Sequence, residues 1–147
     1  MPLLSKWGPH AARVLLGLVF LVFGLNYFVP FLPAPPLPEA ALPFLGGLAS
    51  VGYLFPLVKA IEVAAGVALL ANRYVPLALA LLAPIIVNIA GFHFTVAPSY
   101  GMPIALLVLE LYLAWSWRSA FAPMLRARTA PAASAEPEPA RPAIAVT

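Results

Sequence analysis

The chain has 147 residues, of which 63% are hydrophobic and only 9% are charged, and its formal net charge is +3. A soluble domain typically has about 25% charged residues, and a chain with so few polar residues cannot cover its surface in water. The composition therefore predicts a membrane protein. The absence of cysteine excludes disulfides, thiolate-bound metals, iron–sulfur clusters and dithiol redox chemistry.

Four stretches are long and apolar enough to cross a bilayer as helices. We predict these helices at about residues 13–32, 53–72, 74–93 and 102–120. Residues 38–50, in the proline-rich connection after the first helix, are expected to form a short interfacial segment. The fold class is thus all-α, with a four-helix membrane domain at residues 1–121. Residues 122–147 are rich in Ala, Pro, Glu and Arg, which predicts a disordered cytoplasmic tail.

The positions of Lys and Arg in short loops predict the orientation. Lys6 and Arg13 precede the first helix, Arg73 lies between the second and third, and four more arginines follow the fourth. The loops after the first and third helices contain neither residue type. This pattern predicts a multi-pass protein of the plasma or inner membrane, with both termini in the cytoplasm and Arg13 as a cytoplasmic anchor.

The second helix has two opposite charges, Lys59 and Glu62, in an otherwise apolar stretch. An unpaired charge near the bilayer centre costs about 2.5–3.5 kcal/mol on insertion scales. Because residues at i and i+3 share a helix face, we predict that the two form a pair directed away from lipid. A purely structural role, in which the pair fixes helix packing, is the alternative.

The other three helices also contain polar residues in the half of the membrane away from the cytoplasm. These residues are Asn26 in the first helix, Asn88 and His93 at the third, and Glu110 in the fourth. With a rise of about 1.5 Å per residue, they fall at depths similar to those of Lys59 and Glu62. We therefore predict one enclosed polar site formed by all six residues. Since it contains two carboxyl groups and one ammonium, one carboxyl is expected to hold or share a proton, as a proton relay requires.

Each member of this predicted site has a simpler alternative role. Asn26 and Asn88 also suit ordinary hydrogen bonds between helices, and His93 suits an interfacial position. The glycines at positions 17, 24 and 66 are better explained by close helix packing than by ligand contact.

The sequence restricts the possible cofactors. His10 and His93 lie at opposite sides of the predicted bilayer, so one haem cannot use both. No glycine-rich nucleotide-binding motif is present. A metal site formed by Glu62, Glu110 and His93 is disfavoured by the ammonium of Lys59, so we predict no metal. No cofactor is evident from the sequence, although a quinone head group would suit apolar walls combined with such a polar site.

Three stretches resemble the DoxX-like family of small four-helix integral membrane proteins. They are RVLLGLVFLVFGLNYF at 13–28, LFPLVKAIEVAAGVALLANRYVPLALALLAPIIVNIAGFHF at 54–94 and ELYLAWSWR at 110–118. The resemblance implies a role in membrane redox complexes. Members of the family are associated with a thiosulfate:quinone oxidoreductase and with a complex containing superoxide dismutase and a thiosulfate sulfurtransferase-like protein. It implies no set of catalytic residues.

These observations leave three functions open. The first is a membrane subunit of a quinone-linked redox or oxidative-stress complex, and if the chain is part of an enzyme it is an oxidoreductase subunit. Its expected partners are the lipid bilayer and either soluble redox subunits or a second copy of the chain. No nucleic-acid partner is expected. The second is a non-catalytic anchor or assembly partner of soluble enzymes. The third is a transporter of small solutes or protons, which would need an oligomer because four helices per chain are few.

Overall fold

The computed structural model describes residues 2–33 and 36–128, with side chains in the first helix described from residue 7 onward. Within these residues the secondary structure is entirely helical, which confirms the all-α prediction. The helices are α1 (Pro2–Phe28), α2 (Ala41–Ser50), α3 (Leu54–Leu70), α4 (Val75–Thr95), α5 (Gly101–Ser116), α6 (Arg118–Phe121) and a 3₁₀-helix at Ala122–Leu125.

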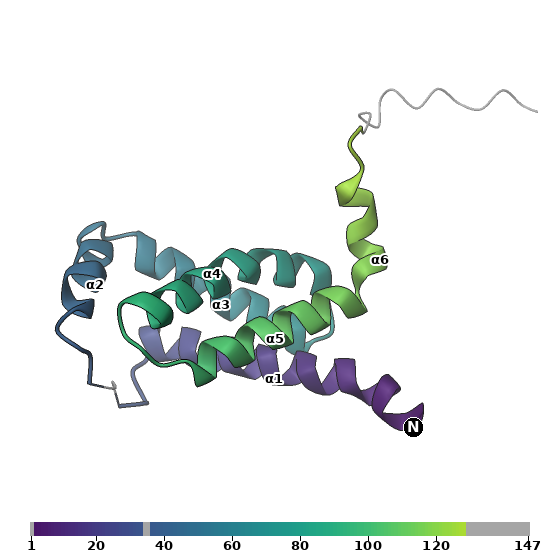
Figure 1. The fold of residues 1–147 in the computed structure, drawn as a ribbon, viewed down its shortest axis with the longest axis horizontal. Helices are drawn as coiled ribbons and strands as arrows, with labels where there is room; N and C mark the ends of the chain where they lie inside the picture. The colour runs from purple at the N-terminus through teal and green to yellow at the C-terminus, as the bar shows by residue number, and fades with distance from the viewer. Residues whose placement is uncertain (1, 34–35, 129–147) are drawn as a thin grey trace, which may run out of the picture.

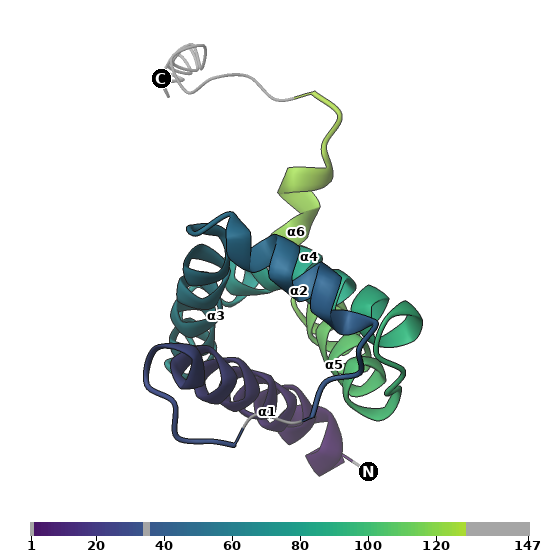
Figure 2. The ribbon, with the colours of Figure 1, turned by 90° about the vertical axis from the view of Figure 1, so that its left-hand side faces the viewer.

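The four long helices pack side by side in the cyclic order α1, α3, α4, α5, and each contacts the helices on both sides (Figure 2). Successive long helices run in opposite directions, so the N-terminus of α1 and helix α6 lie at the same end of the bundle (Figure 1). The short helix α2 lies across the opposite end, and its axis makes an angle of 91° with that of α3.

Two helical segments, Trp7–Phe28 and Val75–Thr95, are each long and apolar enough to span a membrane. The number rises to four if the bent pairs α2–α3 and α5–α6 are each counted as one span. Large apolar side chains are exposed on the outer faces of all four long helices, for example Leu15, Leu57, Leu77 and Leu111. Such a surface suits lipid better than water, in agreement with the predicted membrane protein.

The first helix differs from its predicted bounds at both ends. It begins at Pro2 rather than near residue 13, and it ends at Phe28 rather than near residue 32. A helix can begin at a proline, because the N–H that proline lacks would have no hydrogen-bond partner in the first turn. At the other end, Asn26 Oδ1 accepts hydrogen bonds from the backbone N–H groups of Phe31 at 2.9 Å and Leu32 at 2.7 Å. These bonds compete with helix continuation and turn the chain.

The last predicted helix is interrupted at Trp117, whose backbone angles are φ −102° and ψ 18°. The helical segment after it is bent from α5 by 74°. Arg118 Nη1 donates to the carbonyl oxygen of Trp115 at 3.0 Å, and its guanidinium lies 5.1 Å from the centre of the Trp115 ring. Ala122–Leu125 is helical where a disordered tail was predicted, and residues 129–147 of that tail lie outside the described residues.

Close packing of α1 on α3 depends on glycine. A Cβ atom on Gly66 would lie 2.7 Å from the backbone nitrogen of Leu21 and 2.9 Å from the carbonyl oxygen of Gly17. A Cβ atom on Gly24 would lie 2.8 Å from Val63 Cγ2. The predicted packing role of these glycines is confirmed, because a side chain at either position would push the two helices apart.

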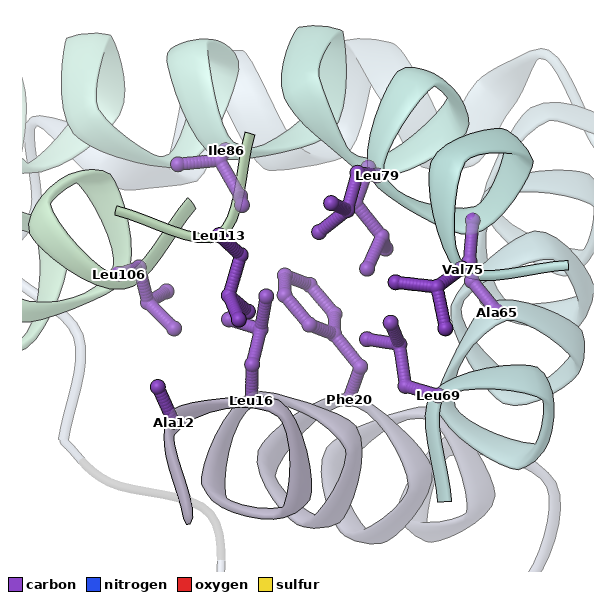
Figure 3. Packing of buried hydrophobic residues seen from close by; sticks show 12 residues of the cluster. Ala12, Leu16, Phe20, Ala65, Leu69, Val75, Leu79, Ile86, Leu106 and Leu113 are labelled. Atoms are coloured by element: carbon purple, nitrogen blue, oxygen red, sulfur yellow. The ribbon is translucent and has the colours of Figure 1, made fainter. Parts of the chain in front are cut away.

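The apolar core fills only part of the bundle. Leu16, Phe20, Leu69, Leu79 and Leu113 are buried and point toward one another between the four long helices (Figure 3). Most of the core comes from the middle of α1, the end of α3 and the first half of α4, together with Leu106 and Leu113 of α5. The end covered by α2 contains two cavities.

Candidate functional site

An ion pair on α3 lies beside these cavities. Lys59 Nζ donates to both carboxylate oxygens of Glu62, at 3.0 and 2.8 Å. Glu62 is only 2% exposed, whereas the Lys59 side chain is 23% exposed. No other ion pair occurs among the described side chains of residues 7–33 and 36–128. The ammonium thus neutralises the buried carboxylate and has a third N–H left for another acceptor.

The larger cavity, which we call the α2 cleft, has a volume of about 420 Å³ and lies between α2, α3 and α4. Its walls are mainly apolar and include Phe44, Leu48, Phe55 and Phe92. The aromatic rings of Phe44 and Phe92 are 5.4 Å apart, so α2 and α4 are in contact across it. Its polar lining comes from α3 and α4, while α2 supplies an apolar cover.

The smaller cavity, which we call the inner chamber, has a volume of about 180 Å³. Residues from α1, α3, α4 and α5 line it, including the buried Phe20 and Leu106 and the exposed Phe23 and Met102. Four residues line both cavities, namely Lys59, Glu62, Ile89 and His93. The ion pair and the imidazole therefore stand at the boundary between the α2 cleft and the inner chamber.

The contact of His93 with the backbone suggests its tautomer. His93 Nδ1 lies 3.3 Å from the carbonyl oxygen of Ala97. Because a carbonyl oxygen can only accept, this contact requires the proton on Nδ1, and Nε2 of the neutral ring is then an acceptor. The imidazole can therefore offer an acceptor where Lys59 offers a donor.

Asn88 is exposed and bonds within its own helix. Its Nδ2 donates to the carbonyl oxygen of Pro84 at 3.0 Å, so the alternative of a hydrogen bond between helices is wrong for this residue. Asn88 nevertheless lines the α2 cleft. Its Oδ1 has no hydrogen bond to the described residues and adds an acceptor to the polar lining.

Two of the six predicted site residues lie apart from this group. Asn26 holds the turn after α1 and lines neither cavity. Glu110 is 7% exposed on α5, lines neither cavity, and has a buried Oε2 without a hydrogen-bond partner. The prediction of one site formed by all six residues is therefore wrong, because similar depth along a helix does not specify which way a side chain points.

The sequence interpretation missed Arg13. This residue is 7% exposed, and its Nη1 donates to the carbonyl oxygens of Leu69 and Leu70 at the end of α3. Its interpretation as a cytoplasmic anchor did not predict this contact, in which the guanidinium satisfies carbonyls that a helix end leaves unpaired. The spacing of Arg13, Leu16 and Phe20, three and then four residues apart, was the available signal that Arg13 shares the buried face.

The described residues show no cluster of three or more His, Cys, Asp or Glu side chains arranged to bind a metal ion. The arrangement instead offers an apolar cleft with an ammonium donor, an imidazole and an amide in its lining. Such a site can hold a lipophilic molecule with a small polar head group, since ligand pockets are mainly apolar with a few placed polar groups. Comparisons of the chain with models of known families, with curated proteins and with solved structures gave no match.

Proposed function

We propose that this chain is an integral membrane protein that binds a quinone-type molecule in the α2 cleft, as the membrane subunit of a quinone-linked redox complex. In this proposal all four long helices cross the membrane, as the resemblance to the DoxX-like family implies. Both termini lie in the cytoplasm, as the positions of Lys and Arg predict. The observation that supports it most is the α2 cleft itself, which combines aromatic walls with Lys59 and His93.

The size and chemistry of the cleft suit a quinone head group. A volume of about 420 Å³ falls within the range of about 300–1,000 Å³ typical of small-molecule pockets. A quinone carbonyl accepts hydrogen bonds, which suits the third N–H of Lys59. A quinol hydroxyl donates hydrogen bonds, which suits Nε2 of His93 and Oδ1 of Asn88. The same lining thus serves both redox forms, and a soluble partner subunit would supply or accept the electrons.

The test is saturable binding of a short-chain quinone to the chain in nanodiscs, with empty nanodiscs as the measure of partitioning into lipid. A photoreactive quinone should crosslink to peptides from α3 and α4. Val58→Trp, which fills the cleft, should abolish saturable binding. Val67→Trp, a matched change at an exposed position of α3, should leave it intact. Equal binding by the two variants, or no saturable binding by the wild type, would refute the proposal.

The anchor hypothesis has support from a different observation. At the end opposite α2, α6 and the 3₁₀-helix extend away from the bundle (Figure 1). Met124 and Leu125 are 71% and 82% exposed there and suit contact with a partner or the membrane surface. If anchoring is the only function, the double variant Lys59→Met with Glu62→Leu should retain the soluble partners that copurify with the wild type, and replacing Met124 and Leu125 by Ser should release them.

A further inference from the structure

The segment after α5 leaves the bundle sideways. Helix α6 and the following 3₁₀-helix make an angle of 74° with α5. They extend beyond the outline of the four long helices, at the end that carries the N-terminus (Figure 1, Figure 2). Where α5 crosses a membrane along its normal, such a segment runs nearly parallel to the membrane surface, as an interfacial helix does.

The large apolar side chains of this segment share one side. Phe121 packs against the core of the bundle. Met124 and Leu125 follow it three and four residues later, a spacing that keeps side chains on one helix face. Both are exposed, because the segment extends past the bundle. Since Phe121 directs this face back toward the bundle, we expect Met124 and Leu125 to face the lipid that surrounds the helices.

The charged residues of the segment are all positive. Arg118, Arg126 and Arg128 are exposed, and none of them forms an ion pair within the described part of the chain. Arg73, in the exposed turn between α3 and α4, adds a fourth positive charge at the same end of the bundle. Such an excess of one sign of charge attracts a partner of the opposite sign.

No acidic side chain among the described ones, in residues 7–33 and 36–128, balances these charges. Glu62 and Glu110 are buried within the bundle, and the exposed Glu39 precedes α2 at the opposite end. Residues 129–147 contain two glutamates and one arginine, which are too few acidic groups to neutralise four arginines. The negative charge must therefore come from outside the chain.

The junction between α5 and the segment has the chemistry of a membrane interface. Trp115 is 70% exposed, and the guanidinium of Arg118 lies 5.1 Å from the centre of its ring. Tryptophan is enriched where helices emerge from lipid, and long basic side chains there reach toward the head groups. Arg118 uses one N–H on the carbonyl oxygen of Trp115, so most of its five donors remain for phosphate oxygens.

We propose that residues 118–128 form an interfacial element that binds anionic phospholipids. Met124 and Leu125 insert between the lipids at the level of the head groups, and the three arginines of the element bind the phosphates. A basic segment directly after a membrane-spanning helix is attracted by the negative surface potential of the cytoplasmic leaflet. This placement rests on the membrane crossing and orientation in the proposed function, but it needs no quinone.

The first test locates the element with nitroxide labels on the full chain, in nanodiscs of phosphatidylcholine and phosphatidylglycerol. Because the chain has no cysteine, Met124→Cys, Ser119→Cys and Leu111→Cys each accept a single label. Ser119 lies two residues before Phe121, on the opposite side of α6, and Leu111 is exposed within α5. We expect oxygen, which concentrates in lipid, to reach the labels at 111 and 124. A water-soluble nickel complex should reach the label at 119.

The label at 111 separates failure of this element from failure of the membrane crossing. If that label is in lipid while the label at 124 is in water, the element is refuted and the crossing is retained. If the label at 111 is in water, the crossing and the element are both refuted. A label at 124 that becomes shielded only when a copurifying soluble protein is bound would show a protein partner instead and would also refute the element.

The second test asks whether the anionic head group is required. The ratio of inserted to free label at Met124→Cys is measured from the two components of its spectrum. Replacing Arg118, Arg126 and Arg128 by Gln should lower this ratio about fivefold per arginine when phosphatidylglycerol is present. Replacing the same three residues by Lys, which keeps the charge, should retain it. Equal ratios in the wild type and the Gln variant, or equal wild-type ratios with and without phosphatidylglycerol, would overturn the proposal.

Discussion

The sharpest stability prediction concerns Gly66, at the contact between α1 and α3. A Cβ atom there would lie 2.7 Å from a backbone nitrogen and 2.9 Å from a backbone oxygen of α1, and neither atom can move without moving the helix. Overpacking of this kind costs about 1–3 kcal/mol. Gly91 in α4 is the matched control, because a Cβ atom at that position would meet nothing within 4 Å. Replacing a helical glycine by alanine otherwise stabilises by about 0.5–1 kcal/mol.

We therefore expect Gly66→Ala to be less stable than Gly91→Ala by about 1–3 kcal/mol, which corresponds to about 5- to 150-fold in the unfolding equilibrium constant. The assay is unfolding in mixed micelles by increasing the fraction of a denaturing detergent, followed by circular dichroism. Helix propensity favours alanine equally at both sites, so the difference between the variants isolates the packing term. Equal stability would refute the close approach of α1 and α3.

Three further predictions use the same unfolding assay. Glu62→Gln should destabilise by about 3–5 kcal/mol, because it leaves the ammonium of Lys59 without its partner, and replacing both residues by Leu and Met should recover most of the loss. A double variant no more stable than Glu62→Gln would contradict this. Asn26→Ala should lower the free energy of unfolding by about 1–2 kcal/mol, because two hydrogen bonds to the backbone are lost, and it should retain quinone binding. A variant that keeps full stability but loses quinone binding would show that Asn26 belongs to the site. Arg13→Met should lower the free energy of unfolding by about 1.5–3 kcal/mol, because the carbonyls at the end of α3 lose a charged donor. The control Arg73→Met, at an exposed position, should change it little. Similar losses in the two variants would show that Arg13 is not buried.

Much of the architecture follows from local sequence properties. Long apolar runs interrupted by prolines and short polar turns define helices without knowledge of their neighbours, because backbone groups in an apolar environment must satisfy one another within the helix. The pairing of Lys59 with Glu62 was predictable for the same reason, since both lie on one face of one helix. The close-packing glycines on α1 and α3 were also identified from their type and position alone.

Which residues line the site depends on how the helices pack against one another. Their positions along the helices placed Asn26 and Glu110 at the depth of Lys59. The rotation and register of the helices instead direct Asn26 to a turn and Glu110 into the core, away from both cavities. Arg13 is buried because the end of α3 lies beside it, which its own neighbours in sequence do not specify. The amino-acid sequence alone determined a membrane-type helical chain with a charged pair in α3. Only the packing of α1, α3, α4 and α5 decided which polar groups share a cavity, because a helix specifies its own faces and the neighbouring helices determine what each face meets.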